Sequence, residues 1–104
     1  MKYSEIMDII KTGEGYTIEL KESINSSMGK DICAFANSSG GKIIIGVEDK
    51  TNKVIGYKLT NSGRSKVQDI ARNMNPSFNV QIEQIKNLAI IYVPEGKNKP
   101  YTVN

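Results

Sequence analysis

The segment AFANSSGGKIIIGVED, residues 34–49, contains the most informative pattern of the chain. Its first residues suit a helix, and the pair Gly40-Gly41 follows them directly. Glycine adopts the left-handed backbone conformation that ends a helix and reverses the chain. The run 42–47 is rich in β-branched residues and apolar at successive positions, which is typical of a strand buried on both faces. The segment therefore predicts a helix, a tight reversal and a central strand.

Helices and strands alternate on both sides of this segment. Alternating apolar residues at 16–21 predict a half-buried strand with Tyr16, Ile18 and Leu20 on one face. Periodicity predicts helices at 4–13, 25–37 and 62–74 and further strands at 54–57, 78–85 and 88–93. Without the first helix and the short strand at 54–57, the order is β-α-β-α-β-β. We expect a two-layer α+β fold in which helices pack on one mixed sheet, with an added N-terminal helix.

Size and composition exclude several classes of protein. The 104 residues suffice for a single domain, 1–104, and they include one cysteine and no histidine. An internal disulfide, a zinc site of several thiolates and histidine-dependent nucleophiles are therefore excluded. No apolar run approaches the roughly 18 residues that cross a bilayer, and the first residues lack a secretory signal. We expect a cytoplasmic protein without membrane contact. Because 101–104 resembles the start of a strand, we expect an N-terminal fragment of a longer protein.

Charge is distributed unevenly along the chain. Residues 1–49 hold 8 acidic and 5 basic side chains, whereas residues 50–104 hold 3 acidic and 9 basic ones. A basic half attracts phosphate backbones through counterion release, and an acidic half can hold a divalent cation. The same asymmetry also fits an ordinary solvated surface. The charge pattern therefore favours a polyanion as partner without excluding the simpler explanation.

The central segment and its flanks resemble the Schlafen AlbA domain, also called the divergent AAA domain. The resemblance spans roughly residues 14–101 and rests on 34–49, together with 19–23, 54–56, Val93-Pro94 and Pro100-Tyr101. The β-α-β-α-β-β order also resembles the Alba fold, a nucleic-acid-binding scaffold. In bacterial and archaeal members, the domain precedes a winged-helix region in proteins assigned to transcription regulation. The resemblance therefore implies a DNA-binding domain of a transcriptional regulator.

In animal Schlafen proteins, a related domain is a metal-dependent endoribonuclease that cuts structured RNA. The resemblance places its three carboxylates at Glu14, Glu19 and Asp49, with Mg²⁺ or Mn²⁺ as the metal. Carboxylates on neighbouring strands suit such cations, and Lys21, on the face of Glu19, is suited to neutralise a phosphate. Alternatively, Glu19 and Lys21 form a surface ion pair and Asp49 is a turn former. Whether the domain is an enzyme stays open on these residues.

We expect the chain to bind nucleic acid, DNA rather than RNA, without a required cofactor. The expected phosphate contacts are basic residues of the second half: Lys50, Lys53, Lys58, Arg64, Lys66, Arg72, Lys97 and Lys99. Arg64, Gln68 and Arg72 recur at helical spacing and form one flank of their helix. The metal-dependent endoribonuclease is the alternative function. A dimerisation or scaffold module, acting as a homodimer, is a lesser alternative.

Four smaller features have competing interpretations. Gly40-Gly41-Lys42 resembles part of a phosphate loop, but such loops run from strand to helix, so we expect a structural reversal and no ATP hydrolysis. Asn37 is expected to cap its helix or to bond the Asp49 turn. Cys33 is expected in the core rather than as a nucleophile. Tyr57 and Tyr101 lie near basic residues, where tyrosines stack on bases or, more commonly, are half-buried strand residues.

Overall fold

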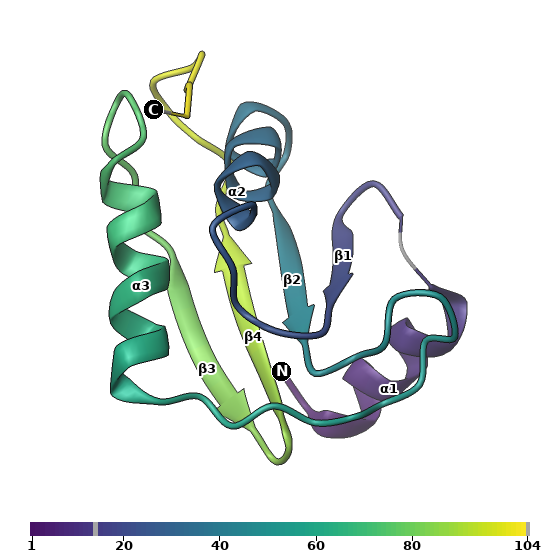
Figure 1. The fold of residues 1–104 in the computed structure, drawn as a ribbon. Coiled ribbons are helices and arrows are strands. Elements are labelled where there is room, and N and C mark those ends of the chain that lie inside the picture. Colours follow the sequence, from purple (N-terminus) through teal and green to yellow (C-terminus); the bar gives the residue numbers. More distant parts are fainter. Residues whose placement is uncertain (14, 104) are drawn as a thin grey trace.

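A four-stranded mixed sheet forms the centre of the computed structural model, which describes residues 1–13 and 15–103 (Figure 1). The strands are β1 (Ile18–Lys21), β2 (Gly41–Ile45), β3 (Gln81–Ile85) and β4 (Leu88–Val93). Their spatial order is β1-β2-β4-β3; β1 and β2 run parallel, whereas β4 is antiparallel to both of its neighbours. The expected α+β fold with a mixed sheet is confirmed.

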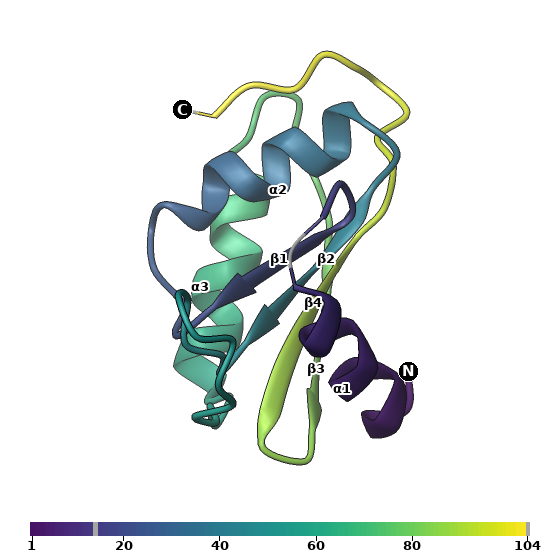
Figure 2. The same ribbon diagram turned by 90° about the vertical axis from the view of Figure 1, so that its right-hand side faces the viewer.

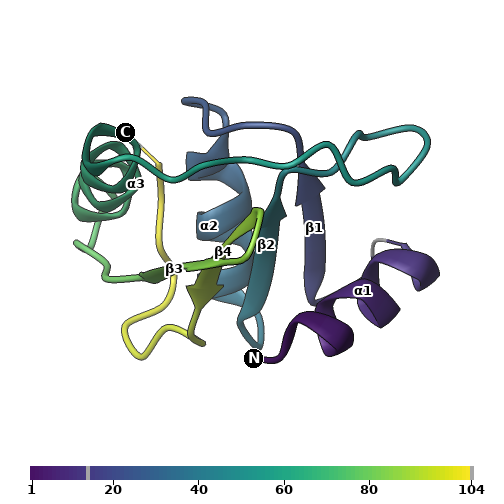
Figure 3. The same cartoon turned by 90° about the horizontal axis from the view of Figure 1, so that it is seen from below.

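Two helices cover one face of the sheet, and a third lies on the other. Helices α2 (Met28–Asn37) and α3 (Asn61–Arg72) pack on the first face, while α1 (Tyr3–Thr12) covers part of the second (Figures 2 and 3). Thr60 begins α3 by accepting a hydrogen bond from the Gly63 amide at 3.0 Å. Along residues 1–13 and 15–103, no helix is long and apolar enough to cross a membrane.

A cluster of buried apolar side chains lies on each face of the sheet. Strand β2 contributes to both clusters, as its continuous apolar sequence predicts. Ile43 and Ile45 pack under α2 and α3, whereas Ile44 points to the opposite face and contacts the cluster that includes Ile6 and Ile10 of α1. All five side chains are essentially excluded from solvent. A strand with this pattern needs cover on both faces. The N-terminal helix therefore belongs to the fold.

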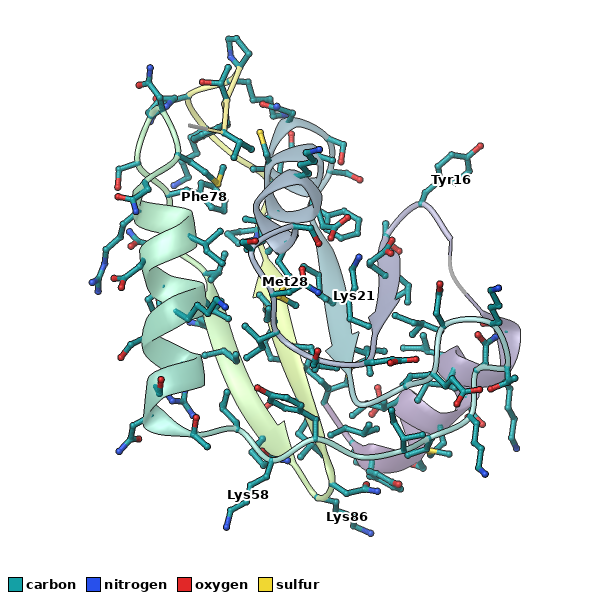
Figure 4. All side chains as sticks on the ribbon, viewed as in Figure 1. Tyr16, Lys21, Met28, Lys58, Phe78 and Lys86 are labelled. Atoms are coloured by element: carbon teal, nitrogen blue, oxygen red, sulfur yellow. The ribbon has the colours of Figure 1, made fainter. Side chains whose placement is uncertain are left out.

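Strand β1 is shorter than expected, and Tyr16 is not part of it. The sequence pattern placed Tyr16 on the buried face with Ile18 and Leu20, but its side chain is fully exposed and points away from the sheet (Figure 4). Gly15 forms an isolated bridge with Ile18, so the chain turns immediately before β1. This turn interrupts the alternation on which the prediction depended.

Two other expected strands also differ from the prediction. Residues 54–57 form only an isolated bridge, in which Val54 pairs with Val47. Gly56 has φ +85°, a conformation that breaks the strand. Strand β3 begins at Gln81 rather than at Phe78, although Phe78 and Val80 are buried in the core before it. Phe78 and Val80 are therefore apolar because they are buried in the core, although neither belongs to a strand.

Asn37 binds the C-terminal segment, and both interpretations of it from sequence were wrong. Its Nδ2 donates to the Tyr101 carbonyl at 2.9 Å, and its Oδ1 accepts from the Tyr101 amide at 2.7 Å. One side chain therefore satisfies both backbone groups of Tyr101, as a neighbouring strand would. Cys33 is half-buried on the same helix face, with its Sγ 3.1 Å from the same carbonyl. The tyrosine ring is buried and packs edge-on against Phe78.

Candidate functional site

A lysine lies between two carboxylates on the face of β1 that α2 covers. Lys21 Nζ is 3.3 Å from Asp31 Oδ2 of α2 and 3.8 Å from Glu19 Oε1, and about a quarter of each side chain is exposed (Figure 4). Asp31 Oδ2 is buried and accepts no well-aligned hydrogen bond, so the lysine charge is what balances it. The predicted Glu19–Lys21 ion pair is present. Asp31 is a second partner of Lys21, which the sequence did not indicate.

Both carboxylates of this cluster pair with the Lys21 ammonium group. Asp49 is exposed in the turn after β2, where Glu48 rather than Asp49 accepts the hydrogen bond of Thr51 at 2.8 Å. Glu14 lies outside the described residues. Within 1–13 and 15–103, no three carboxylate or thiol side chains are grouped closely enough to hold a metal ion. The Glu14, Glu19 and Asp49 site, and the nuclease that depends on it, stay predictions.

The basic flank of α3 is turned toward the outer edge of β3. Arg64 Nη1 donates to the Ile82 carbonyl at 2.7 Å, and Gln68 Nε2 donates to the Val80 carbonyl at 3.1 Å. The two side chains bond outward-facing carbonyls of an edge strand, which would otherwise be open to pairing. Arg64 remains largely exposed, so it is fixed in position and still offers further N–H donors.

Removing this contact should loosen the packing of α3 on the sheet edge. We expect Arg64→Met to lower the free energy of unfolding by about 1–1.5 kcal/mol, because a charge-assisted hydrogen bond to a backbone carbonyl is lost. The matched control Lys66→Met, which changes an exposed residue of the same helix, should stay within about 0.5 kcal/mol of the wild type. Urea unfolding followed by circular dichroism measures both variants. Equal stability of the two would contradict the bracing role of Arg64.

The other predicted phosphate contacts are dispersed. Lys50 and Lys53 lie in the loop between β2 and α3, which runs past α1 on the side of the molecule away from α3 (Figures 1 and 3). Lys97 and Lys99 belong to the C-terminal segment, where Lys99 pairs with Glu95 at 2.6 Å. On α3, Lys66 and Arg72 are exposed, and Arg72 is 3.9 Å from Asp69. These residues do not form one surface.

Three adjoining hollows follow β3 and share lining residues, and we refer to them together as the β3 groove. The hollows measure about 480, 650 and 580 Å³; the first and second share Gln84, and the second and third share Val80, Gln81 and Tyr92. The first lies at the β3–β4 turn, the second between α3 and the edge of β3, and the third on the sheet face opposite α2. The polar and aromatic residues that line the groove are Ser39, Lys42, Tyr57, Lys58, Arg64, Gln68, Asn79, Gln81, Glu83, Gln84, Lys86, Asn87 and Tyr92.

Four cationic side chains occur along the β3 groove with a single carboxylate. Lys58 and Lys86 project at the β3–β4 turn (Figure 4), Arg64 lies midway, and Lys42 lines the far hollow. Among the ion pairs of residues 1–13 and 15–103, none involves these three lysines. Lys86 Nζ lies 4.8 Å from the Tyr3 ring centroid, a contact that leaves its charge uncompensated. The groove therefore presents net positive charge.

Tyr92 lies at the junction of two hollows and is bonded to the carboxylate of the groove. Its hydroxyl donates to Glu83 Oε1 at 2.6 Å, the short length expected when the acceptor is charged. Burial, together with this neighbouring carboxylate, raises the pKa of the Tyr92 phenol to about 12. The phenol is therefore protonated at neutral pH and keeps the ring in one orientation, while Glu83 is engaged by that bond.

The sequence singled out Tyr57, Lys58, Arg64 and Gln68 of this groove, but it indicated no binding role for Lys42, Gln81, Lys86 or Tyr92. Gln81 and Tyr92 pair within the β3–β4 hairpin, whereas Lys42 comes from the distant strand β2. The register Lys42–Tyr92–Gln81 makes the three side chains neighbours. The pairing of β2 with β4 was the missing information, since nothing in the local pattern of any of these strands specifies it.

Comparisons with known proteins identify relatives of sequence and of fold. Residues 14–104 match the sequence model of the family described as Schlafen, AlbA_2. The chain is 30% identical over 77 residues, 70% of its length, to an uncharacterized ATP-binding protein of Ureaplasma parvum serovar 3. The crystal structure of the DIP2311 protein from Corynebacterium diphtheriae matches 94% of the chain with a TM-score of 0.56 and 20% identity, which shows a shared fold. The chain spans 22% of the length of each of these two proteins.

Proposed function

Because this chain belongs to the Schlafen AlbA_2 family, we propose that it is a nucleic-acid-binding domain whose phosphate contacts run along the β3 groove. The observation that carries the proposal is the set Lys42, Lys58, Arg64 and Lys86 along the adjoining hollows of the β3 groove, with Glu83 as the only carboxylate among the described lining residues. Lysine and arginine that neutralise phosphates release condensed counterions, which drives binding whatever the base sequence. The domain would thus hold a strand or duplex in position.

We propose DNA as the ligand and transcription regulation as the role of the whole protein. The support is the resemblance of the chain to bacterial and archaeal members in which this domain precedes a winged helix. In such an arrangement, contacts along the β3 groove would position the nucleic acid, and a further domain would read base edges. Direct comparison of DNA with RNA in one binding assay tests this choice.

ATP binding, which the name of the Ureaplasma relative mentions, does not form part of the proposal. In this chain the glycines that resemble a phosphate loop lie between α2 and β2, in the order opposite to that of a phosphate loop. The amide of Gly40 donates to the Phe35 carbonyl at 2.9 Å, and the amide of Lys42 donates to the Thr17 carbonyl at 2.8 Å. Amides engaged within the fold are not free to surround a phosphate.

A fluorescence anisotropy titration tests the proposed function. The purified chain is titrated into labelled single-stranded DNA, duplex DNA and structured RNA at about 50 mM salt, where phosphate contacts contribute strongly. We expect saturable binding to DNA, at least as tight as to the RNA. Absence of binding to all three ligands would contradict the proposal, and binding confined to the RNA would contradict the choice of DNA.

A further inference from the structure

One row of side chains crosses the sheet on the face that α1 leaves partly uncovered. The register places Ile18, Lys42, Tyr92 and Gln81 side by side on β1, β2, β4 and β3. Side chains of paired residues on one face of a sheet lie within contact distance of each other. Helix α1 packs farther along the same face, against Leu20, Ile44, Leu88 and Ile90. The far hollow of the β3 groove, lined by Lys42, Gln81 and Tyr92, therefore opens above this row.

We propose that this hollow is a binding site for one unpaired nucleobase, which stacks on the Tyr92 ring while Lys42 contacts an adjoining phosphate. The inference rests on the proposed function and names its preferred ligand, a single strand. Bases within a duplex are stacked on each other and offer no free face to a side chain. A partly exposed ring on a sheet, beside cationic groups, is the kind of surface on which single-stranded nucleic acids stack.

Tyr92 has the orientation that stacking requires. Its hydroxyl is bonded to Glu83 at 2.6 Å, and its half-buried ring packs against the cluster of Ile44 and Ile90. The hydrogen bond and the packing together fix the ring, so little conformational entropy is lost when a base binds. The ring lines both the hollow beside Lys42 and the hollow beside Arg64. A base on Tyr92 would thus have a cationic group available on either side for its phosphates.

The rim of the hollow supplies neutral hydrogen-bonding groups. Ser39, Asn79 and Gln81 line it together with Lys42, and all of these except the half-buried lysine are exposed. Hydroxyl and amide side chains both donate and accept, so they suit the edges of any base. Among the described residues that line this hollow there is no carboxylate. Its charge therefore favours an anionic ligand, such as a phosphate-bearing strand, over a neutral or basic peptide segment.

A pair of strands that differ only in their bases tests the proposal. A fluorescein-labelled oligothymidine of about 12 nucleotides is compared with a strand of equal length and charge that carries abasic residues throughout. We expect the wild-type chain to bind the abasic strand about 5- to 150-fold more weakly, as the loss of one stacked base predicts. Tyr92→Leu should bind oligothymidine more weakly than the wild type by the same factor. Its affinity for the abasic strand should equal that of the wild type. Tyr92→Phe, which keeps the ring, should restore most of the affinity for oligothymidine.

The control variant is Tyr16→Leu, which removes a fully exposed tyrosine that does not line the groove. It should bind both strands as the wild type does, and circular dichroism should show that all three variants are folded. Equal affinity of the wild type for the two strands would overturn the stacking site and leave the proposed function intact. No binding to either strand, or to duplex DNA, would overturn the proposed function and the stacking site together.

Discussion

Replacing Gly40 by alanine is expected to lower the free energy of unfolding by about 3 kcal/mol or more. Gly40 has φ +86°, where a side chain is strained by about 1–2 kcal/mol. An added Cβ would also lie 2.7 Å from the Val93 carbonyl oxygen and 2.9 Å from the Glu95 nitrogen. Both neighbours are backbone atoms, so relief of the overlap would require β4 and the following segment to shift.

The matched control for Gly40 is Gly15. A Cβ on Gly15 would meet no atom within 4 Å, so Gly15→Ala should change stability by less than about 1 kcal/mol. Urea unfolding of the two variants, monitored by circular dichroism, gives the comparison directly. If Gly40→Ala unfolds at the same urea concentration as the wild type, the turn between α2 and β2 does not lie as close to the end of β4 as in this structure. The structural explanation of this glycine pair would then fail.

Removing the lysines of the β3 groove is expected to weaken DNA binding on the order of 100-fold at about 50 mM salt. The variant carries Lys42→Gln, Lys58→Gln and Lys86→Gln. Each phosphate contact contributes roughly 0.7 to the slope of log K against log salt for a single strand, so three lost contacts have a large combined effect at low salt. Arg64 is left in place because it braces α3 against β3.

A second triple variant controls for the change in net charge. Lys50→Gln, Lys53→Gln and Lys97→Gln remove the same three charges from the +3 chain at positions that do not line the groove. Their loss should weaken binding by less than about 5-fold, because it reduces only the long-range attraction between the chain and the DNA. Anisotropy titrations with one labelled single strand compare the two variants. Equal weakening by both triples would mean that overall charge, rather than the β3 groove, holds the nucleic acid.

Local sequence patterns predicted the elements of the fold well where burial follows a regular period. The strand at 88–93 was predicted with its observed bounds, and the two-sided apolar run after Gly41 correctly indicated a central strand. Tyr16 shows the limit of this reasoning, because a turn at Gly15 ended an alternation that looked continuous. Local patterns carry period and turn chemistry, but they do not report where a neighbouring segment interrupts a strand.

The candidate site was less predictable because it depends on contacts between distant residues. Asn37 binds a tyrosine 64 positions away, and Asp31 reaches Lys21 from another element; neither partner is indicated by residues near it in sequence. Arg64 was predicted as a phosphate contact, but its bond to the Ile82 carbonyl depends on the packing of α3 on β3, which the sequence does not indicate. Charge counts identified the basic half of the chain, while strand order brought Lys42 of the acidic half to the same groove as three cations of the basic half.

The salt dependence of DNA binding reports directly on phosphate contacts along the β3 groove. The affinity of the wild-type chain for a labelled single strand is measured between about 50 and 200 mM salt. Three to four phosphate contacts along the β3 groove predict a slope of log Kd against log salt of about 2–3, which is a weakening of roughly 20- to 50-fold. An affinity that does not change over this range, or no binding at the lowest salt, would contradict the account.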